Sequence, residues 1–200
     1  TIVFGGRFSG SRQIIDDRYI ADYVAQHPDT LVGFMSIDPV LDTVEDIEYK
    51  YYDLHLKGIK TSTFYCNTGL ADERFAPIFA AAERLGLPMI FHLGPAFPKH
   101  CFSKYGDPKP LEGIALRYPK LKIIIAHMGY PYEYELLHIV RRYPNLFVDM
   151  SAMVQQPWDF YNKLMMYHEW HYMDKVLLGS DFPFGTHKER YDGLMNVNQF

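Results

Sequence analysis

Seven short apolar runs alternate along the chain with seven segments of helical pattern, and this alternation constrains the fold more than any other feature. The runs are nearly continuous, as is typical of strands that are buried on both faces of a parallel sheet. In residues 72–86, for example, apolar residues recur on one helical face, and Gly86 stands where a C-cap glycine is expected. The seven apolar runs are 1–6, 30–39, 56–65, 87–94, 121–129, 145–152 and 176–180.

A repeated order of strand and then helix predicts parallel βαβ units, in either an open doubly wound sheet or a closed barrel. No run is followed by a GxGxxG sequence, so a dinucleotide-binding open sheet has little support. A repeat of roughly 25 to 35 residues suits a barrel. We therefore predict an α/β protein with a TIM-type (β/α)8 barrel, as one domain over residues 1–200. Because seven strands are visible and such barrels have eight, we expect the first strand and its helix to be missing.

Composition excludes several classes of protein. The chain is 48% hydrophobic and 16% aromatic, which is typical of a globular domain with large core or pocket side chains. A net charge of -4 without a basic cluster excludes a nucleic-acid partner, and no apolar run is long enough to span a membrane. Cys66 and Cys101 form no CxxC pair. They predict free thiols in a reducing compartment, hence a cytoplasmic location, with a single disulfide as the alternative.

Three strand-like runs end on an ionisable residue just before a loop that contains Gly or Pro. His92 ends its run in "PMIFHLGP", His127 in "IIIAHMGYP" and Asp181 in "LLGSDFPF". A single such histidine is more often a hydrogen-bonded structural residue. All three, however, are expected at the carboxyl ends of parallel strands, which share the face that carries TIM-barrel active sites. Because a buried carboxylate without a partner is costly, we expect a metal ion, another cation or a protonated histidine to face Asp181.

These strand ends, together with "GIK" at residues 58–60, resemble the motifs of a known protein superfamily, and the resemblance covers most of the chain. The stretches "ERLGLPMIFHLG", "YPKLKIIIAHMG", "YPNLFVDMSA" and "VLLGSDFPFG" resemble the amidohydrolase superfamily. The likeness is to the branch of aminocarboxymuconate-semialdehyde decarboxylase, the resorcylate-type decarboxylases and the dicarboxylate lactonases. It implies a (β/α)8 barrel with one divalent metal, usually zinc, with manganese as the alternative. It also implies that His92 and Asp181 bind the metal, that Asp181 handles the proton of metal-bound water, and that His127 is a ligand or a general acid/base.

The chain departs from that family at its start. The first strand of the family ends in His-x-His or Glu-x-His, whereas "TIVFGG" matches the second strand. His92 and Asp181 are two ligands, and a catalytic zinc typically has three from the protein. The metal is therefore expected to be absent if the chain is a remnant, or present if another histidine replaces the lost ligands. We favour a third explanation, in which the chain is a fragment or processed form of a longer enzyme.

Four residues are predicted to bind substrate. Arg7 suits a substrate carboxylate, because a guanidinium binds carboxylates in a bidentate manner, although an ordinary surface arginine is the alternative. Phe64, Phe97 and Phe182, with Phe184 beside them, are expected to line an apolar or aromatic pocket, or else to pack in the core.

Three other features have structural interpretations. "HEWH" at 168–171 has its histidines three apart and predicts an exposed helix surface rather than a zinc site. Lys60 is expected to line the barrel or to pair with a carboxylate, rather than to bridge two metals as a carboxylated lysine. Asp38, before Pro39, predicts a turn.

The resulting functional hypothesis is a hydrolase of a small carboxylate-bearing or aromatic ester, lactone or amide, which acts through metal-activated water. The first alternative is a non-oxidative decarboxylase of an aromatic or unsaturated acid, on the same site. The second is a metal-free, non-catalytic barrel or fragment. The expected partner is a small-molecule substrate. A homodimer or larger assembly is also expected, because a barrel that lacks a strand leaves two unpaired edges.

Overall fold

A computed structural model describes residues 1–10, 14–94 and 98–197 as one parallel sheet that curls into a half-barrel. The strands are hydrogen-bonded in the order in which they occur in the sequence, and each neighbouring pair is parallel. The predicted α/β class and strand order of a TIM barrel are therefore confirmed. The strands are β1 (Ile2–Phe4), β2 (Val32–Ser36), β3 (Ile59–Ser62), β4 (Met89–His92), β5 (Ile123–Ile125), β6 (Leu146–Asp149) and β7 (Val176–Leu177).

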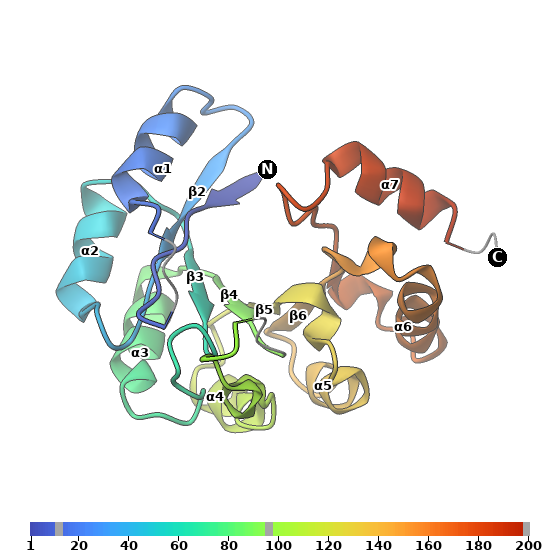
Figure 1. Ribbon diagram of the computed structural model, residues 1–200. Helices are drawn as coiled ribbons and strands as arrows, with labels where there is room; N and C mark the ends of the chain where they lie inside the picture. Colours follow the sequence, from blue (N-terminus) through green and yellow to red (C-terminus); the bar gives the residue numbers. More distant parts are fainter. Residues whose placement is uncertain (11–13, 95–97, 198–200) are drawn as a thin grey trace.

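Helices cover the outer, convex side of the sheet (Figure 1). Local sequence explains several of their ends: Thr43 forms a capping box with Asp46, Thr186 forms another with Glu189, and Gly86 adopts the left-handed C-cap that its position predicts. The helices are α1 (Asp17–Ala25), α2 (Val44–Tyr52), α3 (Phe75–Leu85), α4 (Leu111–Arg117), α5 (Glu133–Val140), α6 (Pro157–Glu169) and α7 (His187–Met195). Short 3-10 turns are η1 (Ser103–Gly106), η2 (Ala126–Gly129), η3 (Met153–Gln155) and η4 (Met173–Lys175).

Side chains of the strands divide between two apolar clusters. The larger cluster lies between the sheet and the helices and includes Ile59, Met89 and Phe91. A smaller cluster on the concave face is made of Phe34, Ile90, Ile124 and Ala126, with Phe147 packed against it. Because successive strand residues point to opposite faces, the residues two positions after Ile90 and Phe147 also face the interior. Those residues are His92 and Asp149.

The two outer strands of the sheet each have one neighbour. In the described residues β1 pairs with β2, and β7 pairs with β6. The expected missing strand and the expected self-association both remain predictions. No helix in the described ranges has the length and apolar character needed to cross a bilayer.

Candidate active site

The three predicted strand-end residues all follow strands at the carboxyl edge of the sheet. His92 is the last residue of β4, His127 lies in the turn after β5, and Asp181 lies in the loop after β7. His127 and Asp181 both have a φ of 57°. A left-handed backbone is uncommon for residues other than glycine, and such conformations cluster at functional sites.

The imidazole rings of His92 and His127 are in direct contact. Their centroids lie 4.6 Å apart in an edge-to-face arrangement. Phe64, which is fully buried, packs its ring edge-to-face against His92, with the two ring centroids 4.7 Å apart. The sheet thus brings together three residues that are separated by up to 63 positions in the sequence, from Phe64 to His127.

Ser151 and Asp149 orient the ring of His127. The Nδ1 atom of His127 lies 3.0 Å from the carbonyl oxygen of Ser151 and 2.9 Å from its Oγ atom. The Ser151 hydroxyl donates its hydrogen to Asp149 Oδ1, which also accepts the backbone N–H groups of His127 and Ser151. Both partners of Nδ1 are therefore acceptors. It follows that Nδ1 carries the proton of the neutral ring, and that Nε2 keeps a lone pair.

Lys60 adds a buried cation to this face. It lies on β3 opposite Ile90, and its Nζ atom stands 4.8 Å from the ring centroid of Phe4. Burial lowers the pKa of Lys60, and the charges of Asp149 and Asp181 partly offset this effect. The expectation that Lys60 lines the barrel is confirmed. Lys60 forms no ion pair with Asp181 in the described residues, so the expectation that a cation faces Asp181 remains a prediction.

His92 is neutral in this environment. Burial, and then the charges of His127 and Lys60, hold the pKa of its imidazole well below the usual value. His92 therefore adds no positive charge beside the ring of His127.

Comparison with known proteins identifies the family. The sequence profile of the family described as Amidohydrolase matches residues 3–200. The chain belongs to the amidohydrolase family. The resemblance carried by the strand-end motifs is therefore confirmed.

Solved structures of similar fold include proteins of several activities. An uncharacterised TIM-barrel protein of Bordetella bronchiseptica is 18% identical with a TM-score of 0.82, over 98% of this chain and 70% of that one. A dihydroxybenzoic acid decarboxylase of Polaromonas, solved with manganese and 2-nitroresorcinol, is 19% identical with a TM-score of 0.67, over 92% and 68%. A probable 2-pyrone-4,6-dicarboxylic acid hydrolase of Acinetobacter baumannii is 14% identical with a TM-score of 0.71, over 98% and 75%. At these identities the likeness shows the fold.

One curated relative matches only part of this chain and a smaller part of its own length. The dihydroorotase of Helicobacter pylori is 28% identical over 103 residues, which is 51% of this amidohydrolase and 29% of the relative. The chain therefore matches less than a third of that protein.

The metal centre expected of an amidohydrolase is not complete in the described part of the chain. Within it, no group of three or more His, Cys, Asp or Glu residues is placed to hold a metal ion. His92 and Asp181 are two ligands, and a catalytic zinc typically takes three from the protein. The ligand roles of these two residues remain predictions.

The predicted substrate-binding residues have different surroundings. Arg7 places Nη1 2.8 Å from Asp42 Oδ1, so its guanidinium already holds a carboxylate of this amidohydrolase. Phe64 is buried against His92, whereas the side chain of Phe182 is 72% exposed and that of Phe184 is 70% exposed. Phe97 lies outside the described residues. The substrate-binding roles of all four residues remain predictions.

Two structural interpretations of the sequence are confirmed. His168 and His171 are exposed at the end of α6 and in the turn after it. The Asp38 carboxylate accepts the backbone N–H groups of Ser9 and Val40, as expected of a residue that forms a turn.

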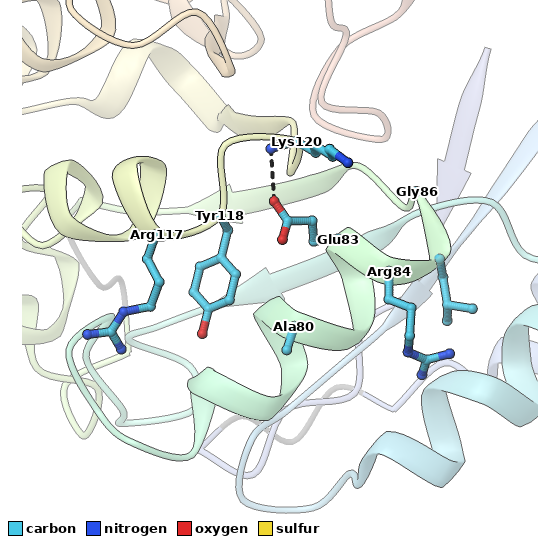
Figure 2. A pocket seen from close by; sticks show the side chains of 8 residues that line it. Ala80, Glu83, Arg84, Gly86, Arg117, Tyr118 and Lys120 are labelled. Atoms are coloured by element: carbon cyan, nitrogen blue, oxygen red, sulfur yellow. Dashed lines mark hydrogen bonds between the residues drawn. The ribbon is translucent and has the colours of Figure 1, made fainter.

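A surface hollow between α3 and α4 lies away from these groups (Figure 2). It is lined by side chains that include Glu83 and Arg117, and the backbone N–H of Lys120 donates to Glu83 Oε1 at 2.8 Å. Gly86, which also lines it, precedes β4, whereas His92 ends that strand. The hollow is therefore at the opposite end of the sheet from the candidate active site.

Sequence reasoning missed Asp149 and Ser151. A signal was present, because "NLFVDMSA" places a carboxylate at the end of an apolar strand, in the same way as His92 and Asp181. The hydrogen bond that His127 Nδ1 donates to Ser151 Oγ joins residues 24 positions apart and depends on how the two loops fold.

Proposed function

We propose that this amidohydrolase hydrolyses an ester, lactone or amide of a small substrate that bears a carboxylate or an aromatic ring. One observation carries the proposal, namely that Nδ1 of His127 faces the two acceptor oxygens of Ser151. The lone pair on Nε2 then makes His127 a general base at the edge of the sheet where TIM-barrel active sites lie.

In this proposal His127 first accepts a proton from water and later donates it to the leaving group. Nε2 accepts a proton from water while the water oxygen forms a bond to the substrate carbonyl carbon. The resulting imidazolium is stabilised by the negative charge of Asp149, which acts through the hydroxyl of Ser151. Nε2–H then returns the proton to the departing oxygen or nitrogen as its bond to carbon breaks.

Asp181 is proposed as a second proton acceptor. Its carboxylate follows β7 at the same edge of the sheet, and its charge acts on Lys60. Asp181→Asn would keep the size of the side chain and remove this capacity.

Decarboxylation is a second candidate reaction, because several solved structures of similar fold are decarboxylases of aromatic acids. The same His127 would start as the imidazolium and donate its proton to the ring carbon. The carbon–carboxylate bond breaks, carbon dioxide leaves, and the electron pair of that bond takes up the proton.

Turnover on a panel of substrates tests both reactions. The panel contains aromatic esters, dicarboxylate lactones, aryl amides and hydroxybenzoates, with acid release measured for hydrolysis and carbon dioxide for decarboxylation. We expect hydrolysis, and a fall in kcat/KM of about 100-fold or more in His127→Gln. The matched control is His168→Gln, because His168 is exposed on α6. Full activity of His127→Gln would contradict the assignment, and no turnover on the whole panel would favour a non-catalytic barrel.

A further inference from the structure

The described residues contain five buried cationic side chains, and four of them have polar partners. Lys50 pairs with two carboxylates, as does Lys163. Lys175 donates to two backbone carbonyl oxygens, and so does Arg190. The fifth buried cation is Lys60.

Lys60 has neither an ion pair nor a hydrogen bond to any described residue. Its side chain is 8% exposed, so water does not replace these partners. Its contact is with the face of the Phe4 ring, 4.8 Å from Nζ. A cation–π contact contributes less than the hydrogen bonds that a buried ammonium needs, and an unpaired buried charge is costly.

Two buried hydroxyl groups beside Lys60 also lack partners. Ser36 Oγ and Ser62 Oγ have no hydrogen-bond partner among the described residues. Ser36 is the residue opposite Lys60 on the neighbouring strand, and Ser62 is two residues further along the strand that carries Lys60. Paired strands lie about 4.8 Å apart, and residues two apart along a strand are about 6.6 Å apart on the same face. One ammonium and two hydroxyls thus face the concave side together, and all three can donate.

We propose that Lys60, Ser36 and Ser62 form a subsite that binds the carboxylate of the substrate. A carboxylate supplies the acceptors that these three donors lack. Arg7 pairs with Asp42 through Nη1, whereas Lys60 has no ion pair among the described residues. The inference rests on the proposed function for the reaction, and it adds to it the group that receives the substrate anion.

The subsite lies next to the catalytic groups. Ser62 is paired in register with His92, whose ring touches that of His127. The carboxylate of Asp149 repels an anion bound nearby. This repulsion is weaker than that of a free carboxylate, because the Oδ1 atom of Asp149 accepts three hydrogen bonds. A substrate held by its carboxylate at Lys60 would therefore present the neighbouring atoms to Nε2 of His127.

Binding of benzoate and of benzamide tests this subsite without any turnover. The two probes have similar shape and differ in charge, and neither needs to react. Calorimetry on the full chain should show benzoate binding at least 10-fold more tightly than benzamide. Lys60→Met should remove this preference, whereas Lys60→Arg should retain it. The matched control is Lys57→Met, because Lys57 is exposed and lies just before the same strand. Ser62→Ala should weaken benzoate about 5-fold and leave benzamide unchanged.

Each other outcome overturns the proposal. The wild-type protein could bind the two probes equally, or fail to bind benzoate. Either result would mean that Asp149 and Asp181, rather than a substrate carboxylate, balance the charge of Lys60. Unchanged preference in Lys60→Met would place the anion elsewhere. Because Lys60→Met removes an unpaired charge, it should fold and melt no lower than wild type, and a failure to fold would mean that the ammonium has a structural partner. Since benzoate binding requires no catalysis, loss of the subsite and loss of the proposed activity are distinguishable.

Discussion

The Nδ1 atom of His127 lies 2.9 Å from the Oγ atom of Ser151, and this contact links the turn after β5 to the turn after β6. Ser151 in turn donates to Asp149, so that a carboxylate acts on the imidazole through a hydroxyl group. The arrangement fixes which ring nitrogen of His127 is free to take a proton.

Replacing Ser151 by alanine should slow turnover without weakening substrate binding. The variant loses the hydroxyl link to Asp149 but keeps the backbone carbonyl that lies 3.0 Å from His127 Nδ1. We expect kcat to fall by about 10-fold, the effect of one hydrogen bond of roughly 1.4 kcal/mol, with KM unchanged. Steady-state kinetics measure both constants, and Ser103→Ala, at an exposed position, is the control. An unchanged kcat would show that Ser151 does not position the base.

Metal content should be well below one ion per chain after dialysis against metal-free buffer. The described residues provide two predicted ligands, His92 and Asp181, and no group of three. A site with two protein ligands holds zinc or manganese weakly. Elemental analysis for both metals measures the content. A stoichiometric ion that survives dialysis would contradict the two-ligand site, and loss of that ion in His92→Ala would identify one ligand.

Asn145→Ala should destabilise the fold by roughly 2 to 3 kcal/mol, because buried carbonyl oxygens lose their donor. The side-chain amide of Asn145, just before β6, donates to the carbonyl oxygens of Ala115, Tyr118 and Leu121. Urea unfolding measures the change. The control is Asn162→Ala, an exposed amide on α6 that should cost less than about 0.5 kcal/mol. Equal losses in both variants would contradict the role of Asn145.

The stability contribution of Asp17 should decrease as pH rises. Burial raises the pKa of this carboxyl above 3.8, more than the charge of Lys50 and the hydrogen bond from Ser36 lower it. The folded protein therefore binds this proton more tightly than the unfolded chain does. The contribution is fully present below the unfolded pKa of 3.8 and is lost as pH rises through the raised folded pKa.

Asp17→Asn isolates this effect. The difference in unfolding free energy between wild type and variant should fall over that pH window and then stay constant, as measured by urea unfolding at a series of pH values. Asp22→Asn, at an exposed position on the same helix, should show no such trend. A wild-type advantage that grows with pH would mean that the ion pair with Lys50 outweighs burial.

The alternation of strands and helices could be predicted because each element has a recognisable local sequence pattern. Continuous apolar runs and helical periodicity identify each element, and the end of each run identifies residues such as His92. The shared edge of a parallel sheet then places His92 and His127 on one side of the molecule. The contact between their rings follows from this topology.

Pairings between distant polar groups could not be predicted in the same way. Arg7 and Asp42 are 35 positions apart, and nothing in the surrounding sequence indicates that one holds the other. Lys60 is the opposite case. Among the described residues it has no ion pair, and this depends on which carboxylates the fold brings within reach. The exposure of Phe182 could not be predicted either. The backbone of Asp181 is left-handed, and the loop that follows it leaves the ring of Phe182 exposed.

The tautomer of His127 should be measured first, because the proposed general base requires a proton on Nδ1 and a lone pair on Nε2. Nitrogen-15 NMR of histidine-labelled protein near neutral pH, with the signals assigned by their loss in His127→Gln, distinguishes the two ring nitrogens. We expect a protonated Nδ1 and an unprotonated Nε2 for the neutral ring. A neutral ring with its proton on Nε2 would contradict this expectation, since His127 could not then accept a proton from water at that atom.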